Sequence, residues 1–462
     1  MTQTVGELRA AVSGAVFAPE DDGYDTARRL WNAEHVREPA LIAQVHSAED
    51  VQAAVRYAVA EGLEIAVRGG GHSIAGLSSV DGGLMIDLSQ LNQVTVDPEA
   101  RRARVGGGAL LRDLDAATQE HGLAVPAGLI GHTGVGGLTL GGGMGWLTRM
   151  HGLTIDNLES VQLVTADGSI VRAAEDENAD LFWAVRGGGG NFGVVTEFEF
   201  RLHVAGPIVN FGLAFWGQDQ GAELLRAARE VIPTLPREVN VVIAALNAPP
   251  APFVPEEHHF KPGFALVVVG FGSPEQHAEA VARLQSIPPL FQIVTPMPYV
   301  AVQQLLDEAN GPGMYHYEKG AYLETLSDGA IDVYTSQQLN KTSPMSAAMI
   351  YHLDQGYLET ADDATAFGGQ RTERYAMFVI ATAPVPEALE PERAWVRGFW
   401  DAIQPYAINI GSYVNGMAEP DAARIQASYG DKYARLVELK RKYDPDNVFR
   451  RNQNINPAAT GS

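Results

Sequence analysis

Two glycine-rich segments constrain the fold of this chain more than any other feature. The first is RGGGHS at residues 68–73, and the second is GVGGLTLGGG at residues 134–143. Glycine has no Cβ, so the backbone N–H groups of such segments can approach a pyrophosphate closely. His72 lies within the first segment and offers a ring nitrogen beside that site. The sequence therefore predicts a binding site for a nucleotide-type cofactor with a histidine next to it.

The charge of the chain argues against whole classes of partner. The 462 residues include 33 Lys and Arg against 56 Asp and Glu, a formal net charge of −23. The resulting field repels the phosphates of nucleic acids and of anionic lipid surfaces. We therefore expect no nucleic-acid partner and no membrane partner, and we leave open whether the protein is a monomer or a homo-oligomer.

Cysteine is absent from the chain, which removes disulfides and thiolate metal sites. The histidines show no metal-binding spacing, since the adjacent His258 and His259 cannot chelate as an i, i+4 pair would. We therefore predict no catalytic metal. Residues 1–10 contain Glu7 and Arg9 and no apolar stretch of the kind found in secretory leaders, so we expect a cytoplasmic protein.

The pattern of apolar residues divides the chain into three regions. Residues 1–205 alternate short strands with helices, as nucleotide-binding regions do, and residues 206–405 contain alternating strands separated by acidic helices. Residues 406–462 end in a charged helix followed by a Pro-containing stretch. The fold class is therefore predicted to be α+β, with an antiparallel sheet covered by helices in the middle region.

Individual elements can be predicted within these regions. Apolar residues at helical spacing predict a helix over 48–61, and the run at 63–67 predicts a strand that leads into the first glycine segment. Strands are predicted over 264–271 and 374–382, and one long helix over 422–442.

The order of short motifs resembles that of one family. Nearly end to end, the chain resembles the berberine-bridge-enzyme-like flavin oxidases of the vanillyl-alcohol-oxidase superfamily. The resemblance implies a bipartite PCMH-type FAD-binding domain, formed by residues 1–205 and completed by residues 406–462, with an inserted substrate domain of antiparallel sheet covered by helices at residues 206–405. Besides the glycine-rich segments, the motifs that carry it are GLTIDN at 152–157, TADG at 165–168, DLFW at 180–183, KYDP at 442–445 and NQNI at 452–455.

In that family the isoalloxazine ring is tethered through its 8α-methyl group to the histidine of the glycine loop, here His72, and the backbone N–H groups around it hold the pyrophosphate. Many relatives add a cysteine bond at flavin C6, but Ile130 stands at the aligned position here. The resemblance therefore implies FAD with a single covalent 8α-histidyl link. The FAD-binding residues that it implies are Arg68, Gly69, Gly70, Gly71, His72, Ser73, Gly76, His132, Thr133, Gly134, Gly137, Leu138, Gly141, Gly142, Trp146, Gly193, Val195, Tyr413, Asn415 and Asn452.

Thr133 stands at the position that, in the family, controls access of O2 to the flavin. Valine-sized side chains permit access there and leucine blocks it, and threonine is isosteric with valine, so the resemblance favours an oxidase over a dehydrogenase. The Thr133 hydroxyl would lie near flavin N5, where it either takes part in catalysis or only satisfies a backbone carbonyl. His132 either contacts substrate or flavin or is a hydrogen-bonded structural residue.

The catalytic base is harder to predict. Many relatives carry Tyr-x-Asn-Tyr in the C-terminal region with the last Tyr as base, whereas this chain has YVNG at residues 413–416. Tyr413 then either packs on the flavin or transfers a proton. We expect the remaining polar groups on strands of the middle region, where residues two apart share a face. The candidates are Tyr315, Tyr317, Tyr357, Glu359 and Tyr375, with Tyr357 and Glu359 preferred.

Together with these residues, the resemblance implies an FAD-dependent oxidase. It would take a hydride from a C–H bond next to O or N of a small secondary metabolite, phenolic, alkaloid-like or sugar, and pass the electrons to O2 to give H2O2. Two alternatives remain open. One is an oxygenase that acts through an oxygenated flavin, and the other is a drug-binding resistance flavoprotein.

Overall fold

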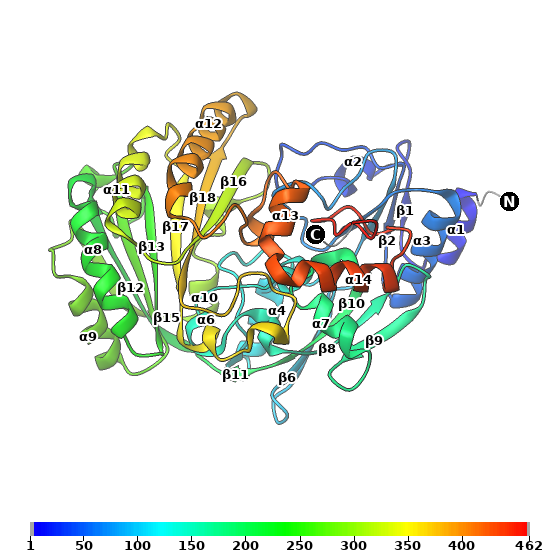
Figure 1. The fold of residues 1–462 in the computed structure, drawn as a ribbon, viewed down its shortest axis with the longest axis horizontal. Helices are drawn as coiled ribbons and strands as arrows, with labels where there is room; N and C mark the ends of the chain where they lie inside the picture. Colours follow the sequence, from blue (N-terminus) through cyan, green and yellow to red (C-terminus); the bar gives the residue numbers. More distant parts are fainter. Residues whose placement is uncertain (1–3, 460–462) are drawn as a thin grey trace.

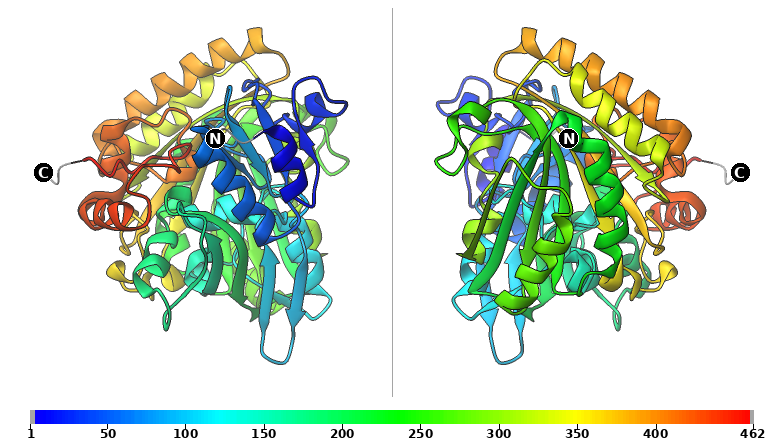
Figure 2. Two further views of the ribbon diagram at one scale, coloured as in Figure 1. Left: turned by 90° about the vertical axis from the view of Figure 1, so that its right-hand side faces the viewer. Right: turned by 90° about the vertical axis from the view of Figure 1, so that its left-hand side faces the viewer.

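The computed structural model describes residues 4–459, so the first three residues of the 1–10 stretch lie outside the described range. Three larger β-sheets and one two-stranded sheet form the framework of these residues. The two N-terminal sheets lie to the right in Figure 1 and the largest sheet lies to the left. The end views of Figure 2 show the N-terminal elements at one end of the molecule and helices α8 and α9 at the other. The arrangement confirms the predicted α+β class.

The first sheet has the strand order β1-β2-β4-β3, with β2, β4 and β3 parallel and β1 antiparallel at one edge. Helix α3 begins after Ser47, whose side chain accepts a hydrogen bond from the Asp50 N–H, and ends at Gly62 with φ 67°. Its apolar face packs on the sheet and on Val164 and Val194 of the second sheet. The elements are α1 (Val5–Ala11), β1 (Val16–Phe17), α2 (Tyr24–Ala27), β2 (Leu41–Gln44), α3 (Ala48–Glu61), β3 (Ile65–Arg68) and β4 (Leu84–Asp87).

The second sheet is antiparallel with the order β5-β6-β10-β8-β9. Its core contains Phe198 and Phe200 together with Phe182 of α7 and Leu436 of the C-terminal helix α14. The elements are β5 (Val94–Asp97), β6 (Arg102–Gly106), α4 (Leu111–Gln119), β7 (Leu123–Ala124), α5 (Val135–Gly141), α6 (Thr148–His151), β8 (Leu158–Val164), β9 (Ile170–Ala174), α7 (Ala179–Val185), β10 (Val194–Arg201) and β11 (His203–Val204).

The third sheet has seven antiparallel strands in the order β15-β12-β14-β13-β17-β18-β16. Helices α8, α9, α11 and α12 cover one face, and the other face packs on residues of the first 205 positions such as Trp146 and Leu147. The elements are β12 (Ile208–Gly217), α8 (Gly221–Val231), β13 (Val239–Asn247), β14 (Pro262–Gly270), α9 (Pro274–Leu284), β15 (Phe291–Pro298), α10 (Tyr299–Gln303), β16 (Tyr315–Leu323), α11 (Asp328–Gln337), β17 (Ala347–Leu353), β18 (Arg374–Ala383) and α12 (Pro386–Ile403).

The C-terminal segment returns to the second sheet. The buried Lys440 ammonium donates to Asp444 (2.7 Å) and to the carbonyls of Asn191 (2.7 Å) and Phe449 (2.8 Å), which ties the segment in place. The single helix predicted over 422–442 is wrong. The chain forms α13 (Ala422–Tyr429) and α14 (Tyr433–Tyr443), because it turns at Gly430 with φ 54°.

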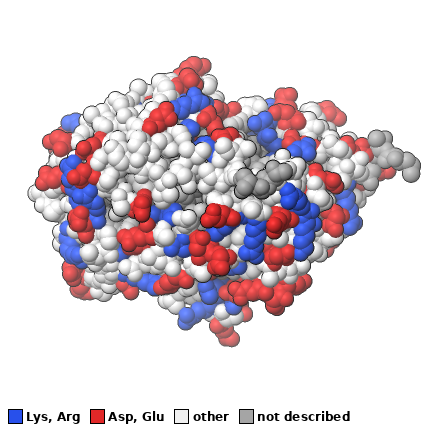
Figure 3. All heavy atoms as spheres, viewed as in Figure 1, with Lys and Arg blue, Asp and Glu red and all other residues white. Residues whose placement is uncertain are grey.

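The other predicted elements are observed close to their expected limits, with α3 spanning the predicted helix and β14 and β18 the predicted strands. Among residues 4–459, no helix is long and apolar enough to cross a membrane, and no group of three or more metal-ligating side chains occurs. On the face drawn in Figure 3, Lys and Arg are interspersed among Asp and Glu rather than gathered into one basic patch.

Candidate functional site

One cavity of about 310 Å³ collects most of the residues that the sequence singles out. Its wall includes residues 69–73 and several of residues 133–140, together with glycines and valines between 189 and 195. Residues from the C-terminal segment, between 413 and 415 and between 449 and 453, complete it. Segments from the N-terminal and the C-terminal parts of the chain therefore meet at this cavity.

The two glycine-rich segments touch directly at the cavity. A Cβ on Gly70 would lie 2.2 Å from the Gly134 nitrogen, and a Cβ on Gly134 would lie 2.3 Å from the Gly70 nitrogen. Only glycine fits at either position. Within the described chain, the backbone N–H groups of residues 69–73 donate to no other residue. A row of free N–H groups without Cβ atoms suits the pyrophosphate of FAD.

The His72 ring lies between Trp31 and His132. The indole ring of Trp31 stacks on it with the ring centroids 4.3 Å apart, and Nε2 of His72 lies 2.7 Å from Nδ1 of His132. Nε2 of His132 lies 3.4 Å from the Asp307 carbonyl oxygen. Burial, together with the neighbouring His132 and His316, lowers the pKa of His72 to about 3. The imidazole is therefore neutral at neutral pH.

Many of the predicted cofactor residues line this cavity. The structure places them in the wall although they come from segments far apart in the sequence. They are Gly69, Gly70, Gly71, His72, Ser73, Thr133, Gly134, Gly137, Leu138, Gly193, Val195, Tyr413, Asn415 and Asn452.

Six predicted cofactor residues do not form the cavity wall. The Arg68 guanidinium is held by Asp87, with Nε 3.0 Å from Oδ1. Arg68 therefore does not line the cavity, contrary to the sequence prediction, and instead anchors the strand that leads into the glycine loop. Trp146 is buried against the inner face of the largest sheet, with Phe211 and Val242, and His132 reaches the site through His72. The six are Arg68, Gly76, His132, Gly141, Gly142 and Trp146.

The sequence reasoning missed one whole side of the cavity. Several of the missed side chains, such as Ile65, Val67 and Phe198, are apolar and lie on strands, where an apolar residue cannot be distinguished from an ordinary core residue by its pattern. A polar exception is Arg451, which donates to the Ser79 carbonyl (2.9 Å). The missed wall residues are Ile65, Val67, Leu77, Ser78, Leu88, Gly107, Gly136, Leu140, Gly189, Gly190, Val194, Phe198, Phe449, Arg451 and Gln453.

Tyr413 enters the cavity from the C-terminal segment. Its phenol oxygen accepts hydrogen bonds from the Gly143 N–H (2.8 Å) and from Nδ2 of Asn415 (3.0 Å). Burial raises the pKa of Tyr413 to about 12, so the phenol is protonated at neutral pH. The same Asn415 amide donates to the carbonyls of Gly137 and Leu138, which joins the C-terminal segment to the second glycine-rich segment.

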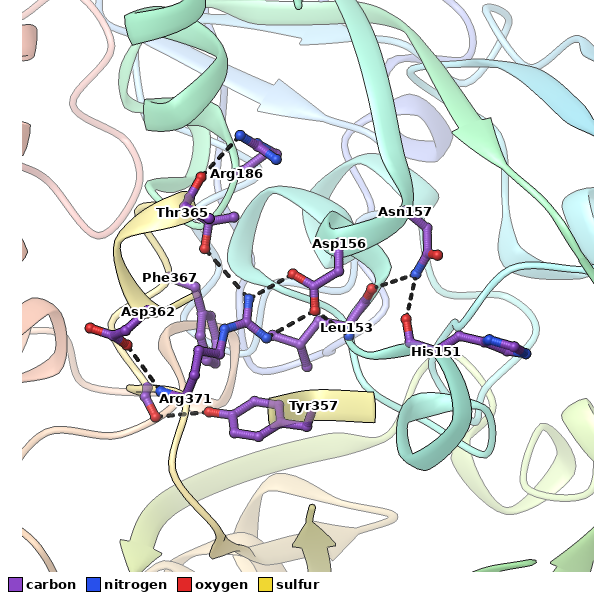
Figure 4. Close-up of polar contacts among 12 residues, drawn as sticks. His151, Leu153, Asp156, Asn157, Arg186, Tyr357, Asp362, Thr365, Phe367 and Arg371 are labelled. Atoms are coloured by element: carbon purple, nitrogen blue, oxygen red, sulfur yellow. Dashed lines mark hydrogen bonds and ion pairs between the residues drawn. The ribbon is translucent and has the colours of Figure 1, made fainter. Parts of the chain in front are cut away.

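The expectation that Tyr357 and Glu359 face the flavin from a strand is wrong. Residues Gln355–Leu358 form a 3₁₀ turn, and neither side chain lines the cavity. The buried Tyr357 hydroxyl donates to a loop carbonyl, that of Gly369 (2.8 Å), next to the Arg371 guanidinium (Figure 4). The Glu359 carboxylate is largely exposed and pairs with Arg237 (Nη2–Oε2 2.9 Å).

Tyr315, Tyr317 and Tyr375 also lie away from the cavity. Strand alternation turns all three to the face of the largest sheet that α12 and its neighbours cover. The Tyr317 hydroxyl donates to Glu419 (2.7 Å), and Tyr375 stacks on His352 with the ring centroids 4.6 Å apart.

The same alternation brings forward a residue that the sequence reasoning passed over. Glu318 directly follows Tyr317 on β16, so its side chain points to the opposite face, toward Gly416 of the C-terminal segment. A Cβ on Gly416 would lie 2.6 Å from Oε1 of Glu318. Burial raises the pKa of Glu318 to about 7. Glu318 stands next to Tyr317, which was predicted to share a face with Tyr315, so strand alternation was the signal that could have placed it on the other face.

Comparisons with known proteins agree with this geometry. Residues 39–174 match the FAD binding domain family, and residues 412–456 match the family described as berberine and berberine like. An FAD-linked oxidoreductase of Dictyostelium discoideum is 30% identical over 99% of this chain and 97% of its own length. (R)-6-hydroxynicotine oxidase of Paenarthrobacter nicotinovorans is 32% identical over 97% of both chains.

The fold is also shared with a solved structure of glucooligosaccharide oxidase from Acremonium strictum, which is described with 6-S-cysteinyl, 8α-N1-histidyl FAD. The TM-score is 0.86 at 25% identity, over 99% of this chain and 100% of the other. Together, the cavity, the matched domains and the full-length relatives assign the cofactor as FAD and the activity as oxidation of small molecules. The chain belongs to the berberine-bridge-enzyme-like family of FAD-linked oxidoreductases.

Proposed function

We propose that this protein is an oxidase that holds FAD through one covalent bond from His72 and passes electrons to O2. Residues 1–205 and 406–462 would form the FAD domain, and residues 206–405 the substrate domain. The observation that carries the proposal is the environment of His72, a neutral imidazole in the wall of the cavity with one nitrogen already bonded to His132.

The hydrogen bonds select the nucleophilic nitrogen of His72. If the His132 Nε2–H donates to the Asp307 carbonyl, Nδ1 of His132 carries a lone pair and accepts from Nε2–H of His72. Nδ1 of His72 then holds the free lone pair, which is the atom needed to form a bond with the 8α carbon of the flavin. His132 would thus set the tautomer of His72.

A single link follows from the composition. The relative from Acremonium strictum is described with both a cysteinyl and a histidyl attachment, whereas this chain has no cysteine and carries Ile130 in the aligned segment. Of those two attachments, this chain could form only the histidyl bond.

Thr133 supports O2 as the electron acceptor. It lines the cavity next to Gly134, and its side chain is no larger than valine. Its hydroxyl bonds to no residue within 4–459, so the reading in which it only satisfies a backbone carbonyl receives no support. The same free hydroxyl supports a second candidate, an oxygenase, because it could donate to an oxygen atom held at the flavin.

When bound, FAD accepts a hydride from a substrate C–H next to O or N and is reoxidised by O2. The chain's own residues supply binding and orientation. Residues 69–73 hold the pyrophosphate through backbone N–H groups, and Asn415 joins the C-terminal segment to the loop at Gly137 and Leu138. The substrate is a small secondary metabolite, as the name of the hydroxynicotine oxidase relative also suggests.

The test is acid precipitation of the purified protein followed by inspection of the pellet. We expect flavin colour in the pellet of the wild type and of His121→Ala, a control at an exposed histidine, and colour in the supernatant for His72→Ala. Colour in the supernatant of the wild type would refute the covalent link. A second assay uses ¹⁸O2 as the electron acceptor. Release of peroxide with no ¹⁸O in the product supports the oxidase, and ¹⁸O in the product supports the oxygenase. Stoichiometric binding of a compound without turnover supports a drug-binding resistance protein.

A further inference from the structure

We propose that the substrate is a hydrophobic amine, that its ammonium group binds to the carboxylate of Glu318, and that this carboxylate accepts the ammonium proton before the adjacent C–H bond is oxidised. This inference rests on the proposed oxidase and adds its substrate class.

The argument begins with the inner face of the largest sheet, which packs toward the FAD domain. The side chains near the middle of this face are apolar but only half-buried, so solvent reaches them although they lie inside the molecule. An accessible apolar surface in the interior is typical of a ligand site. These side chains are Leu213, Val267, Ile293, Met349, Tyr351 and Ile380.

This face is joined to the cofactor cavity by aromatic contacts. Tyr413, which lines the cavity, meets the Phe378 ring edge-on with the ring centroids 6.0 Å apart. Phe378 in turn meets Tyr351 edge-on at 5.8 Å. A molecule that lies on this face next to Tyr413 therefore also lies beside the flavin site.

Glu318 is the carboxylate on this part of the face. It pairs across the sheet with the half-buried Ile380. Within residues 4–459, no side chain or backbone group donates a hydrogen bond to its carboxylate, and no Lys, Arg or His forms an ion pair with it. The ionisable groups that face it are Tyr351 of β17 and Tyr413, and both are neutral phenols near pH 7.

A carboxylate without a counterion is costly in an apolar surrounding, unless a ligand supplies the positive charge. A protonated amine does so and also fills the apolar surface with its carbon groups. A phosphate, a carboxylic acid or a sugar acid would be repelled by the same group. The arrangement therefore favours a cation over an anion, and an amine over a neutral molecule.

Gly416 explains why a carboxylate can occupy this position. Many relatives carry a tyrosine at the aligned position, and a Cβ there would lie 2.6 Å from Oε1 of Glu318. A side chain at position 416 and the present Glu318 rotamer exclude each other. The lack of a side chain at Gly416 thus leaves the space into which the Glu318 carboxylate extends.

The reaction balances as follows. The N–H bond of the ammonium breaks and the proton goes to a Glu318 oxygen, which leaves the electron pair on nitrogen. The adjacent C–H bond then breaks and its electron pair goes to FAD as a hydride, so the amine becomes an iminium ion and FAD is reduced. Oxygen takes up the two electrons and the two protons and leaves as H2O2, and water hydrolyses the iminium ion.

The experiment uses the flavin-loaded enzyme and compares N-methylbenzylamine with benzyl methyl ether, in which oxygen replaces the N–H group, and with benzyl alcohol and cellobiose. Binding is measured by titration calorimetry, and reduction by anaerobic bleaching of the flavin. We expect the amine to bind at least about tenfold more tightly than the ether. Equal affinity, or reduction by the neutral compounds alone, would overturn the proposal.

Three variants separate the charge from a structural effect. Glu318→Gln should abolish the preference for the amine and lower kcat/KM by about 10²-fold or more. That loss should shrink at high pH, where the amine arrives already deprotonated, which no purely structural defect would produce. Glu318→Asp should recover part of the activity, and Glu324→Gln, an exposed carboxylate just beyond β16, should behave as wild type.

The outcomes also separate this inference from the proposed function. The oxidase would be refuted if the protein held no flavin or if no compound reduced its flavin. Calorimetry would still show whether the wild type binds the amine more tightly than the ether and whether Glu318→Gln loses that preference. Rapid reduction by benzyl alcohol or cellobiose, with no preference for the amine, would leave the oxidase standing and refute the role of Glu318.

Discussion

The ion pair between Arg371 and Asp156 offers a test of how the two halves of the molecule are held together (Figure 4). Asp156 belongs to the FAD-binding region and Arg371 to the loop before β18. The guanidinium reaches both carboxylate oxygens, at 2.7 Å and 2.9 Å, and both side chains are at most 5% exposed. Asp156→Asn keeps the shape of the side chain but removes its charge.

The expected loss is large because, among residues 4–459, Arg371 forms an ion pair with no carboxylate other than Asp156. After the substitution its remaining neighbours there are the neutral amide at position 156, the rings of Tyr357 (5.0 Å) and Phe367 (5.2 Å), and the Thr365 hydroxyl at 3.5 Å. Breaking a buried pair in this way costs about 3–5 kcal/mol. Unfolding entropy is about 2.1 cal/mol/K per residue, so for 462 residues the melting temperature should fall by about 3–5 °C.

The assay is calorimetric unfolding of the flavin-loaded enzyme. The double variant Asp156→Leu/Arg371→Met removes both charges and should regain most of the lost stability, since an apolar pair of similar volume replaces a buried ion pair at little cost. A fall below about 1 °C for Asp156→Asn, or a double variant less stable than the single one, would refute the reasoning.

Four further outcomes follow from the site. Gly70→Ala should lose most bound FAD, because its Cβ would lie 2.2 Å from the backbone of Gly134; normal flavin content would contradict this. The affinity of the wild type for N-methylbenzylamine should rise as pH increases through about 7, since the carboxylate of Glu318, whose pKa burial raises to about 7, must ionise to bind the cation; a constant affinity between about pH 6 and 8 would argue against it. Tyr413→Phe should lower kcat less than about tenfold without moving its pH profile, because the phenol, with a pKa of about 12, is not the base; a shifted profile would restore that role. Glu359→Gln should change stability by at most about 1 kcal/mol and leave turnover unchanged, as expected for an exposed ion pair; a large loss of turnover would place it back in the mechanism.

The success and failure of the sequence predictions have physical causes. The glycine loop, His72 and the C-terminal motifs were found because each is local and because glycine is required where Gly70 and Gly134 touch. The apolar wall of the cavity was missed because an apolar strand residue has the same pattern whether it faces a core or a cofactor. Tyr357 was misplaced because it was assigned to a strand, whereas residues Gln355–Leu358 form a 3₁₀ turn.

The sequence by itself determined the family and the cofactor and singled out His72, since short motifs express local chemistry directly. The tertiary structure decided that Glu318 is a carboxylate that faces the C-terminal segment at Gly416. That orientation depends on strand register, which turns Tyr317 toward the helices and Glu318 toward the C-terminal segment, and on the return of Gly416 to within contact of β16. Neither the register nor the return is a property of any local stretch of residues, because both arise from packing between segments far apart in the chain.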